Sequence, residues 1–384
     1  MIAERLRVLT LIDLLEGAGA ERTAVELAIR LDRDRFEPMV CATRSPECEA
    51  TARLRAAGVP VMRLGRTSPV GVHAWAPLMR LLRAGSVDVL HAHKFGSNAW
   101  GTLLGRLTRV PVVIATEHTW AYKGQPVRKL ADHLIGRSAA AFVAVSELDR
   151  RRMVAFERVP FGKTRVIPTG LVPHRHEDGE QGDLRTELGI PPDAPVIGTV
   201  CAIRTQKRLD VLLDAFTIVR RRHADARLII VGDGPGFADL QHDVAARGAG
   251  DAVALLGRRE DVPVLLRALD VFAISSDFEG TPLSLLEAMA AERPVVSTGV
   301  GGIPDVLGRD GACGILVPPG DPAALADGLR VVLEDPGLGR RLGAAAAQRV
   351  GDEYDFDRVV QRWQDLYVEL SRGRVPDKRV ATGV

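Results

Sequence analysis

The sequence predicts an α/β protein made of two doubly wound parallel sheets that face each other across a cleft. Short apolar stretches that fit buried strands alternate with helical patterns along nearly the whole chain, which is typical of βαβ units in parallel sheets. The alternation is interrupted once, by a polar stretch with Pro and Gly over residues 169–182. At 384 residues the chain is long for one hydrophobic core and of ordinary size for two.

These observations predict the domain boundaries. We expect an N-terminal domain over residues 1–170, a linker over residues 171–182 and a C-terminal domain over residues 183–353. A helix over residues 354–371 has the length to pack back toward the N-terminal domain. The tail over residues 372–384 is expected to fray.

The N-terminal domain opens with a strand over residues 6–13, a glycine-rich turn and a helix over residues 20–31. Its further strands are expected over residues 37–43, 60–64, 87–92, 111–116, 141–145 and 165–168. Gly17 and Gly19 match half of a dinucleotide-binding fingerprint, but Arg22 replaces the third glycine and no acid closes the next strand. A nicotinamide-dependent dehydrogenase is therefore disfavoured, and the glycines either let the backbone approach another ligand or let the helix pack.

Histidines stand at two strand ends of this domain. His91 and His93 bracket Ala92 and could share one face, but no third metal ligand is nearby, so hydrogen-bonded loop histidines are the expected interpretation. His118 ends a strand at the sheet edge that should face the cleft. It is a candidate functional residue, and a structural loop histidine is the alternative.

The charge of the chain indicates which partners are expected. The formal net charge of +2 gives no net attraction to nucleic acid, so no such partner is expected. Between Lys94 and Arg165, however, 13 Lys or Arg stand against five Asp or Glu. Arginines of this kind are usually solvated on helix faces. The alternative is a face that rests on anionic lipid and takes an acceptor from the membrane.

The N-terminus and the cysteines indicate the compartment. Glu4, Arg5 and Arg7 interrupt the first apolar run, which does not fit a signal peptide, and no stretch approaches the ~20 apolar residues of a membrane span. The four cysteines are scattered without C-x-x-C spacing, as in a reducing compartment. We expect a cytoplasmic protein, with peripheral placement at the inner face of the cell membrane as a further possibility.

The C-terminal domain repeats the strand and helix alternation. Its strands are expected over residues 196–202, 227–231, 252–256, 270–276 and 314–317, with one more ending at Gly299, and its helices after Asp321 over residues 322–334, 340–350 and 356–370. Arg204 and Lys207 follow the first of these strands just before a helix. Cations at a helix start oppose the helix dipole, so their presence suggests an anion between them.

The stretch from Asp270 to Gly302 carries the most specific pattern. A buried strand is followed by Glu279 and Gly280, after which Thr281 is a good N-cap and Pro282 a good first helical residue. A helix start at the carboxyl edge of a parallel sheet is a favourable anion site. Glu287 interrupts the apolar pattern of that helix, and it either meets an internal arginine or, with Glu279, accepts hydrogen bonds from a polyhydroxylated ligand.

These motifs, in this order, resemble the retaining nucleotide-sugar glycosyltransferases of GT-B architecture, the group 1 or family 4 enzymes that include glycogen-synthase-like and sucrose-synthase-like members. The resemblance covers almost the whole chain. Its most specific element is the E-x7-E spacing from Glu279 to Glu287. The supporting motifs are Arg204 with Lys207, Val231-Gly232-Asp233-Gly234-Pro235, Leu256-Gly257-Arg258 and Gly301-Gly302-Ile303-Pro304.

The resemblance implies a role for each matching position. Glu279 would contact the transferred sugar, Glu287 the ribose hydroxyls, Arg204 and Lys207 the diphosphate, and His118 the sugar near the acceptor side. The remaining positions that the resemblance places around the donor are Gly17, Gly19, Gly232, Arg258, Gly280, Thr281, Pro282 and Leu283. The sequence departs from the usual pattern at three positions: Ala18 interrupts a Gly-Gly pair, Arg208 replaces a glycine, and Asp305 replaces a glutamate.

The expected reaction moves a hexose-type sugar from a UDP- or GDP-sugar to a sugar, lipid-linked sugar or other hydroxyl acceptor, in cell-surface polysaccharide, glycolipid or glycoside biosynthesis. The departing diphosphate would be stabilised by Arg204, Lys207 and the helix start at Pro282, without a metal or other cofactor. Two D-x-D strings, over residues 32–34 and 355–357, lie beside helix ends and are better explained by capping or surface charge. The resemblance suggests retention of anomeric configuration.

Two other functions remain open from the sequence. One is a sugar-nucleotide epimerase or hydrolase on the same scaffold, which would consume donor without an acceptor. The other is a non-catalytic nucleotide-sugar binding subunit, which would bind donor and never consume it.

Overall fold

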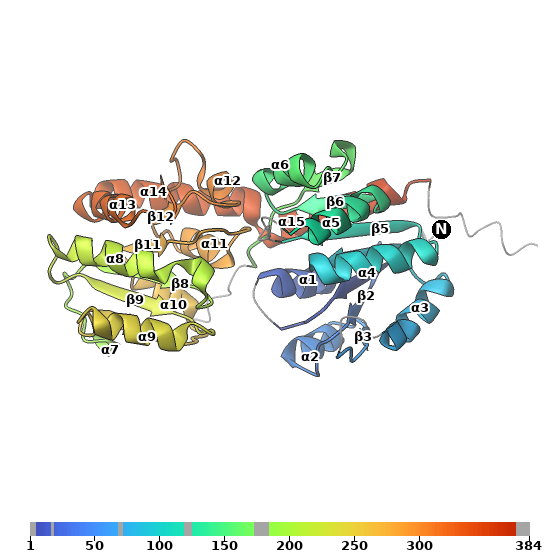
Figure 1. Cartoon of the computed structure of the whole chain (residues 1–384), viewed down its shortest axis with the longest axis horizontal. Coiled ribbons are helices and arrows are strands. Elements are labelled where there is room, and N and C mark those ends of the chain that lie inside the picture. Colours follow the sequence, from blue (N-terminus) through green and yellow to red (C-terminus); the bar gives the residue numbers. More distant parts are fainter. Residues whose placement is uncertain (1–4, 17–18, 68–71, 119–124, 173–183, 374–384) are drawn as a thin grey trace, which may run out of the picture. The chain divides into compact units, whose positions relative to one another are not determined.

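A computed structural model describes residues 5–16, 19–67, 72–118, 125–172 and 184–373 of the chain (Figure 1). The chain separates into two compact units. Unit 1 consists of Met1–Gly170 with Asp357–Val384, and unit 2 consists of Leu171–Phe356. Gly17, most of the expected linker and nearly all of the expected frayed tail lie outside the described residues.

Unit 1 contains a seven-stranded parallel sheet in the order β3-β2-β1-β4-β5-β6-β7. Its strands are β1 (Leu6–Ile12), β2 (Phe36–Ala42), β3 (Val61–Arg63), β4 (Val89–His93), β5 (Val112–Glu117), β6 (Ala141–Ala144) and β7 (Thr164–Val166). The central strands are buried along their whole length, because helices cover both faces of a doubly wound sheet.

The helices of unit 1 follow the strands in alternation. They are α1 (Gly19–Arg30), α2 (Glu49–Ala56), α3 (Ala76–Arg83), α4 (Lys94–Leu107), α5 (Pro126–Ser138), α6 (Glu147–Phe156) and α15 (Phe356–Ser371), with short η1 (Val72–Trp75) and η2 (Phe161–Lys163). The strands that α4, α5 and α6 connect are consecutive neighbours in the sheet. Because βαβ crossovers are right-handed, these three helices lie on the same face of the sheet (Figure 1).

Unit 2 contains a six-stranded parallel sheet in the order β10-β9-β8-β11-β12-β13. Its strands are β8 (Val196–Val200), β9 (Arg227–Val231), β10 (Val253–Leu255), β11 (Val271–Ile274), β12 (Val295–Thr298) and β13 (Ile315–Val317). Its helices are α7 (Leu184–Glu187), α8 (Leu209–Arg220), α9 (Phe237–Ala246), α10 (Val262–Arg267), α11 (Leu283–Ala290), α12 (Ile303–Leu307), α13 (Pro322–Glu334) and α14 (Pro336–Arg349), with short η3 (Thr205–Lys207) and η4 (Val350–Tyr354).

The strand orders locate the ligand edge of each sheet. In unit 2 the chain winds outward from β8 through β9 to β10, then returns to β11 on the other side of β8. In unit 1 it winds from β1 through β2 to β3 and returns to β4 beside β1. Ligands of such sheets bind beyond the carboxyl ends of the strands at this reversal. The loops after β8 and β11 therefore mark the candidate site of unit 2.

Most element boundaries predicted from the sequence differ from the structure by one or two residues, and one helix start is wrong by more. The helix expected from residue 340 begins at Pro336, because the Asp335 side chain accepts a hydrogen bond from the Leu338 N–H and caps an earlier turn. The strand expected over residues 87–92 is β4, which begins at Val89 and ends at His93. In the part of the chain that the structure describes, no helix combines the length and apolar character needed to cross a bilayer.

Candidate functional site

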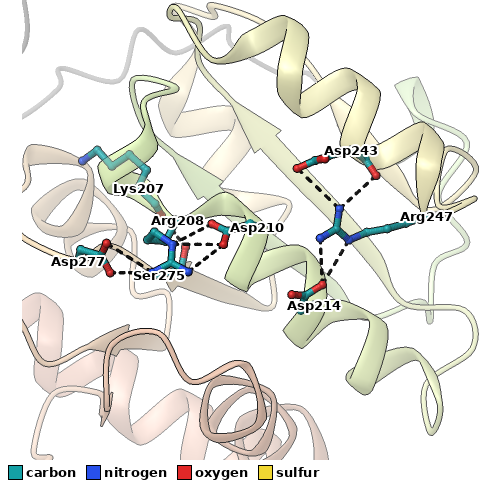
Figure 2. A network of polar contacts seen from close by, with 8 residues as sticks. All are labelled: Lys207, Arg208, Asp210, Asp214, Asp243, Arg247, Ser275 and Asp277. Carbon is teal, nitrogen blue, oxygen red and sulfur yellow. Dashed lines mark hydrogen bonds and ion pairs between the residues drawn. The ribbon is translucent and has the colours of Figure 1, made fainter.

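Two loops meet at the reversal point of unit 2. The loop after β8 carries η3, and the loop after β11 carries Glu279. The Asp277 N–H donates to the Gln206 carbonyl at 2.9 Å, and the Ser275 hydroxyl donates to the Lys207 carbonyl at 2.8 Å. Figure 2 shows Ser275 and Asp277 beside Lys207 and Arg208. One backbone hydrogen bond and one side-chain hydrogen bond thus join the two loops.

Lys207 of the first loop and Glu279 of the second form an ion pair. The Lys207 Nζ lies 2.5 Å from the Glu279 Oε1, which also accepts the Ser276 hydroxyl at 2.7 Å. The Lys207 side chain is 15 % exposed and that of Glu279 8 %. So little exposure makes each charge costly without the other. The cation predicted for the diphosphate and the carboxylate predicted for the sugar are therefore adjacent.

The helix beside this pair begins one residue later than predicted. Pro282 is the N-cap of α11 with an extended backbone (ψ 127°), so the prediction of Thr281 as N-cap and Pro282 as first helical residue is wrong. The reason is that the Pro282 carbonyl already accepts from the Leu285 N–H at 3.2 Å, which defines it as the cap. The first N–H groups of α11 follow, and they carry the positive end of the helix dipole.

Lys207, Glu279 and Pro282 share one pocket. Its lining residues are Thr199, Val200, Cys201, Lys207, Leu209, Ile274, Ser275, Ser276, Glu279, Pro282 and Ser284. The pocket is small, about 10 Å³, so a larger ligand could meet these groups only at its opening. There a cation, a carboxylate and a helix start together suit anionic oxygens and hydroxyl groups.

Other predicted residues stand outside that pocket. Arg204 is exposed and lines a second hollow of unit 2 with Asp277 and Phe278. Arg258 is on the surface, with its side chain 83 % exposed, and Glu287 is half-buried in α11. The structure therefore brings together Lys207, Glu279 and the α11 start, and does not bring Arg204, Arg258 or Glu287 into the same pocket.

Two glycines permit the close backbone contacts of this site. Gly301 has φ 56°, and a Cβ there would lie 1.6 Å from the Glu279 carbonyl oxygen. The next N–H, of Gly302, donates to the Gly280 carbonyl at 2.9 Å. Gly232, with φ 134°, passes the Cys201 carbonyl so closely that a Cβ would lie 1.8 Å from it. Any side chain at either position would displace a loop of the site.

The residues that position the Glu279 carboxylate by hydrogen bonds were not predicted from the sequence. Ser276 donates to its carboxylate, and the Thr298 hydroxyl at the end of β12 donates to the Ser276 carbonyl at 2.7 Å. Both side chains are buried. A serine and a threonine at strand ends read as ordinary sheet residues, so the sequence offered no signal beyond their position.

Arg208 supplies a further link between the two loops. It stands where the resembling family commonly has glycine, and its backbone is left-handed (φ 47°, ψ 47°). Its guanidinium lies between Asp210 at 2.9 Å and Asp277 at 3.2 Å (Figure 2). A left-handed backbone at a non-glycine residue destabilises the fold by about 1–2 kcal/mol. At Arg208 the same residue also forms the ion-pair bridge to the loop that carries Glu279.

Arg208→Gly is expected to distinguish the effect of the left-handed backbone at this position from the effect of the ion-pair bridge. Glycine relieves the strain, and partly exposed ion pairs contribute little, so the stability of unit 2 should change by less than about 1 kcal/mol. The loop after β11 loses its ion pair to Arg208, so the KM for donor should rise several-fold. Arg208→Ala is the matched control, because it loses the bridge and keeps the strain. Calorimetry and steady-state kinetics test this, and an unchanged KM in both variants would show that the bridge does not position the loop.

Histidines meet at the carboxyl edge of the unit 1 sheet. The His93 Nδ1 lies 3.0 Å from the His118 Nε2, and the His91 ring lies 2.7 Å from both the Tyr367 hydroxyl and the Thr116 hydroxyl. The prediction that His91 and His93 are loop histidines is wrong. Both are buried members of β4, hydrogen-bonded within a ring cluster.

Burial keeps these rings neutral. It lowers the pKa of His91 to about 3, with a smaller effect of His118, and it lowers the pKa of His118 to about 3, with a smaller effect of Lys94. The pKa of His93 also lies well below its usual range, because of burial and then the two neighbouring histidines. Neutral imidazoles can exchange hydrogen bonds with a hydroxyl group at this edge.

Around this edge, Lys94 has a left-handed backbone (φ 67°) and lies 2.5 Å from the Glu21 carboxylate of α1. Gly19 is the first residue of α1. The D-x-D strings lie at helix ends, where Asp357 pairs with Arg30 at 2.7 Å. Within the described residues no group of three or more His, Cys, Asp or Glu has an arrangement that could hold a metal ion.

Models of known families match most of the chain. Residues 17–175 match the model described as "Glycosyltransferase Family 4", and residues 180–349 match the model described as "Glycosyl transferases group 1". The first match covers most of the N-terminal segment of unit 1, and the second covers nearly all of unit 2.

Individual proteins give the same result. The chain is 31 % identical over 317 residues to a D-inositol 3-phosphate glycosyltransferase of Streptomyces bingchenggensis, covering 76 % of this chain and 68 % of the relative. It is 24 % identical to the Escherichia coli UDP-Gal:alpha-D-GlcNAc-diphosphoundecaprenol alpha-1,3-galactosyltransferase, covering 92 % and 94 %. The crystal structure of Anabaena HepE with UDP and glucose superimposes with a TM-score of 0.82 at 21 % identity, covering 95 % of this chain and all of HepE. The chain is therefore a glycosyltransferase of the GT-B fold and belongs to the group 1, family 4 glycosyltransferases.

Proposed function

We propose that the protein transfers a hexose-type sugar from a nucleotide-diphosphate sugar to a hydroxyl acceptor with retention of configuration. The observation that carries the proposal is the shared pocket of Lys207, Glu279 and the α11 start. Relatives support the donor class, since the E. coli enzyme is named for UDP-Gal and the HepE crystal contains UDP. The acceptor is proposed to be a sugar, a lipid-linked sugar or another hydroxyl compound.

The proposed chemistry follows from the charges of the pocket. Breaking the sugar–phosphate bond leaves negative charge on the diphosphate, which Lys207 and the amide end of α11 would stabilise. Glu279 would accept hydrogen bonds from the sugar hydroxyls. Arg204 would meet the outer phosphate or the acceptor from the neighbouring hollow. These protein groups supply the positive charge that the leaving group needs, so the proposal includes catalysis without a metal.

The finer assignments belong to the same proposal. Glu287 would bind the ribose, and His118 would hydrogen-bond a sugar hydroxyl as a neutral imidazole. The pathway would be cell-surface polysaccharide, glycolipid or glycoside biosynthesis in the cytoplasm. Contact with an anionic membrane surface is included, because the stretch between Lys94 and Arg165 is strongly basic.

A panel of UDP-, GDP- and ADP-sugars scored by calorimetry tests the donor. A ligand at 100 times its Kd adds about 2.7 kcal/mol to the stability of unit 2. For a unit of this size the melting temperature should rise by about 5–10 °C. One nucleotide class is expected to give this shift, and no shift with any of them would contradict the proposal.

Lys207 allows the donor phosphates to be located. It is the only lysine in the sequence between Leu171 and Phe356. Acylation of that lysine, followed by mass spectrometry, should therefore slow when the matching donor is present, while acylation of the lysines of unit 1 continues. Equal acylation with and without donor would place the diphosphate elsewhere.

Donor consumption in acceptor-free buffer would indicate hydrolysis or epimerisation in place of transfer.

A further inference from the structure

Exposed apolar side chains gather on one part of unit 1. Nine large apolar side chains are exposed in the described part of the chain, and seven of them belong to α4, α5, α6 and η2. Five of the seven lie on α4 and α5 and are here named the apolar face: Leu103, Leu107, Val127, Leu130 and Leu134. The other two are Phe156 of α6 and Phe161 of η2. Single exposed apolar residues are normal on any protein, but a group of this size on neighbouring helices marks an interaction surface.

The spacing of these residues shows that they form continuous stripes. Val127, Leu130 and Leu134 lie at positions i, i+3 and i+7 of α5, which places them along one side of that helix. Leu103 and Leu107 lie at positions i and i+4 of α4, the adjacent helix that packs against α5. The apolar face is therefore shared by two helices of the same layer.

The exposed charges around the apolar face have one sign. The exposed cations of this part of unit 1 include Arg106, Arg109, Lys129, Arg137, Arg151 and Arg158. The stretch from Lys94 to Arg165 contains five acids, and none is exposed: Glu117, Asp132, Asp149 and Glu157 are buried, and Glu147 is half-buried against Arg150 and Arg151. The fold thus covers the carboxylates of this stretch and leaves its cations on the surface.

We infer that the apolar face docks on an anionic lipid bilayer. Leucine and valine side chains would enter the headgroup region while the flanking arginines and Lys129 contact lipid phosphates, the arrangement expected of interfacial helices. A second copy of the chain is the less suitable occupant, because two surfaces with only positive exposed charges repel each other.

The experiment is co-sedimentation of the full chain with vesicles. Binding is expected to vesicles of phosphatidylcholine mixed with phosphatidylglycerol, to weaken as salt is raised, and to be absent with phosphatidylcholine alone. Leu130→Ser with Leu134→Ser should weaken binding roughly tenfold. Arg106→Gln with Arg137→Gln should weaken it roughly fivefold for each charge removed.

The matched control lies in unit 2. Val331 and Arg221 are also exposed, so Val331→Ser with Arg221→Gln changes the same side-chain types and should leave vesicle binding unchanged. Equal binding to neutral vesicles, or unchanged binding by the variants of the apolar face, would overturn the inference. So would concentration-dependent dimers that the leucine variant abolishes.

The inference rests on the proposed function only for the acceptor that a membrane would supply. Vesicle binding requires neither donor nor turnover. A protein that binds vesicles and transfers no sugar would refute the proposed sugar transfer and leave the docking surface standing. A protein that transfers sugar to a water-soluble acceptor and ignores vesicles would refute the docking surface and the proposed membrane contact, and leave the proposed sugar transfer standing.

Discussion

Replacing Lys207 with Met and Glu279 with Gln together is expected to reduce kcat/KM for sugar transfer by at least about 10²–10³-fold, the usual effect of losing one electrostatic contact to the transition state. The double variant is preferred because either single truncation leaves a charge that is nearly buried and without its partner. That state costs roughly 3–5 kcal/mol and would confuse folding with catalysis. Two neutral side chains of similar length avoid it.

The ion pair of Arg247 with Asp214 provides the control. It lies in the same unit, at 3.0 Å, between α8 and the end of α9, and its residues do not line the pocket (Figure 2). Arg247→Met with Asp214→Asn removes the same number of charges and should leave transfer intact. Ordinary turnover by the Lys207 and Glu279 double variant, with its fold preserved by calorimetry, would contradict the proposed site.

The parallel sheets could be predicted from the sequence because each strand is a continuous apolar run followed by a polar turn. The position of each candidate residue at a strand end came from the same pattern. Glu279, for example, follows β11 as expected, and Lys207 follows β8. The fold prediction is confirmed by both the sheet topology and the family match.

The pairing of those two residues could not be predicted. Lys207 and Glu279 are 72 residues apart, and they meet because β11 lies beside β8 in the sheet. Strand order depends on crossovers between distant segments, which local periodicity does not record. The one-residue error at Pro282 has another cause, because proline fits both a helix start and the extended cap that precedes it. Family resemblance, in turn, gave roles to Arg204 and Arg258, whose side chains the structure leaves on the surface.

The histidine cluster of unit 1 should make that unit sensitive to mild acid. In the unfolded chain a histidine has a pKa near 6.5, whereas burial lowers the pKa of His91 to about 3 and that of His93 well below its usual range. Below about pH 6.5 the unfolded state therefore binds protons that the folded state does not bind. Stability is unaffected above pH 6.5 and falls as the pH drops below it. For these two rings and His118, whose pKa burial also lowers to about 3, the loss between pH 7 and pH 5 should be about 6 kcal/mol.

Tryptophan fluorescence can report this loss for unit 1 alone. The four tryptophans of the sequence are Trp75, Trp100, Trp120 and Trp363, and none lies between Leu171 and Phe356, the segment that forms unit 2. Urea unfolding followed by their emission at several pH values should give the predicted slope. His93→Gln removes one of the three rings whose pKa is lowered, so it should remove about a third of the pH dependence.

An exposed histidine serves as the comparison for that variant. His73→Gln changes a solvated ring in the same unit, and the pH dependence of unfolding should remain that of the parent protein. A free energy of unfolding that stays level from pH 7 to pH 5 would mean that the buried rings accept protons in the folded state. In that case His118, which lies 3.0 Å from His93, could be charged in the working enzyme, and its proposed role as a neutral hydrogen-bonding partner of the sugar would be wrong.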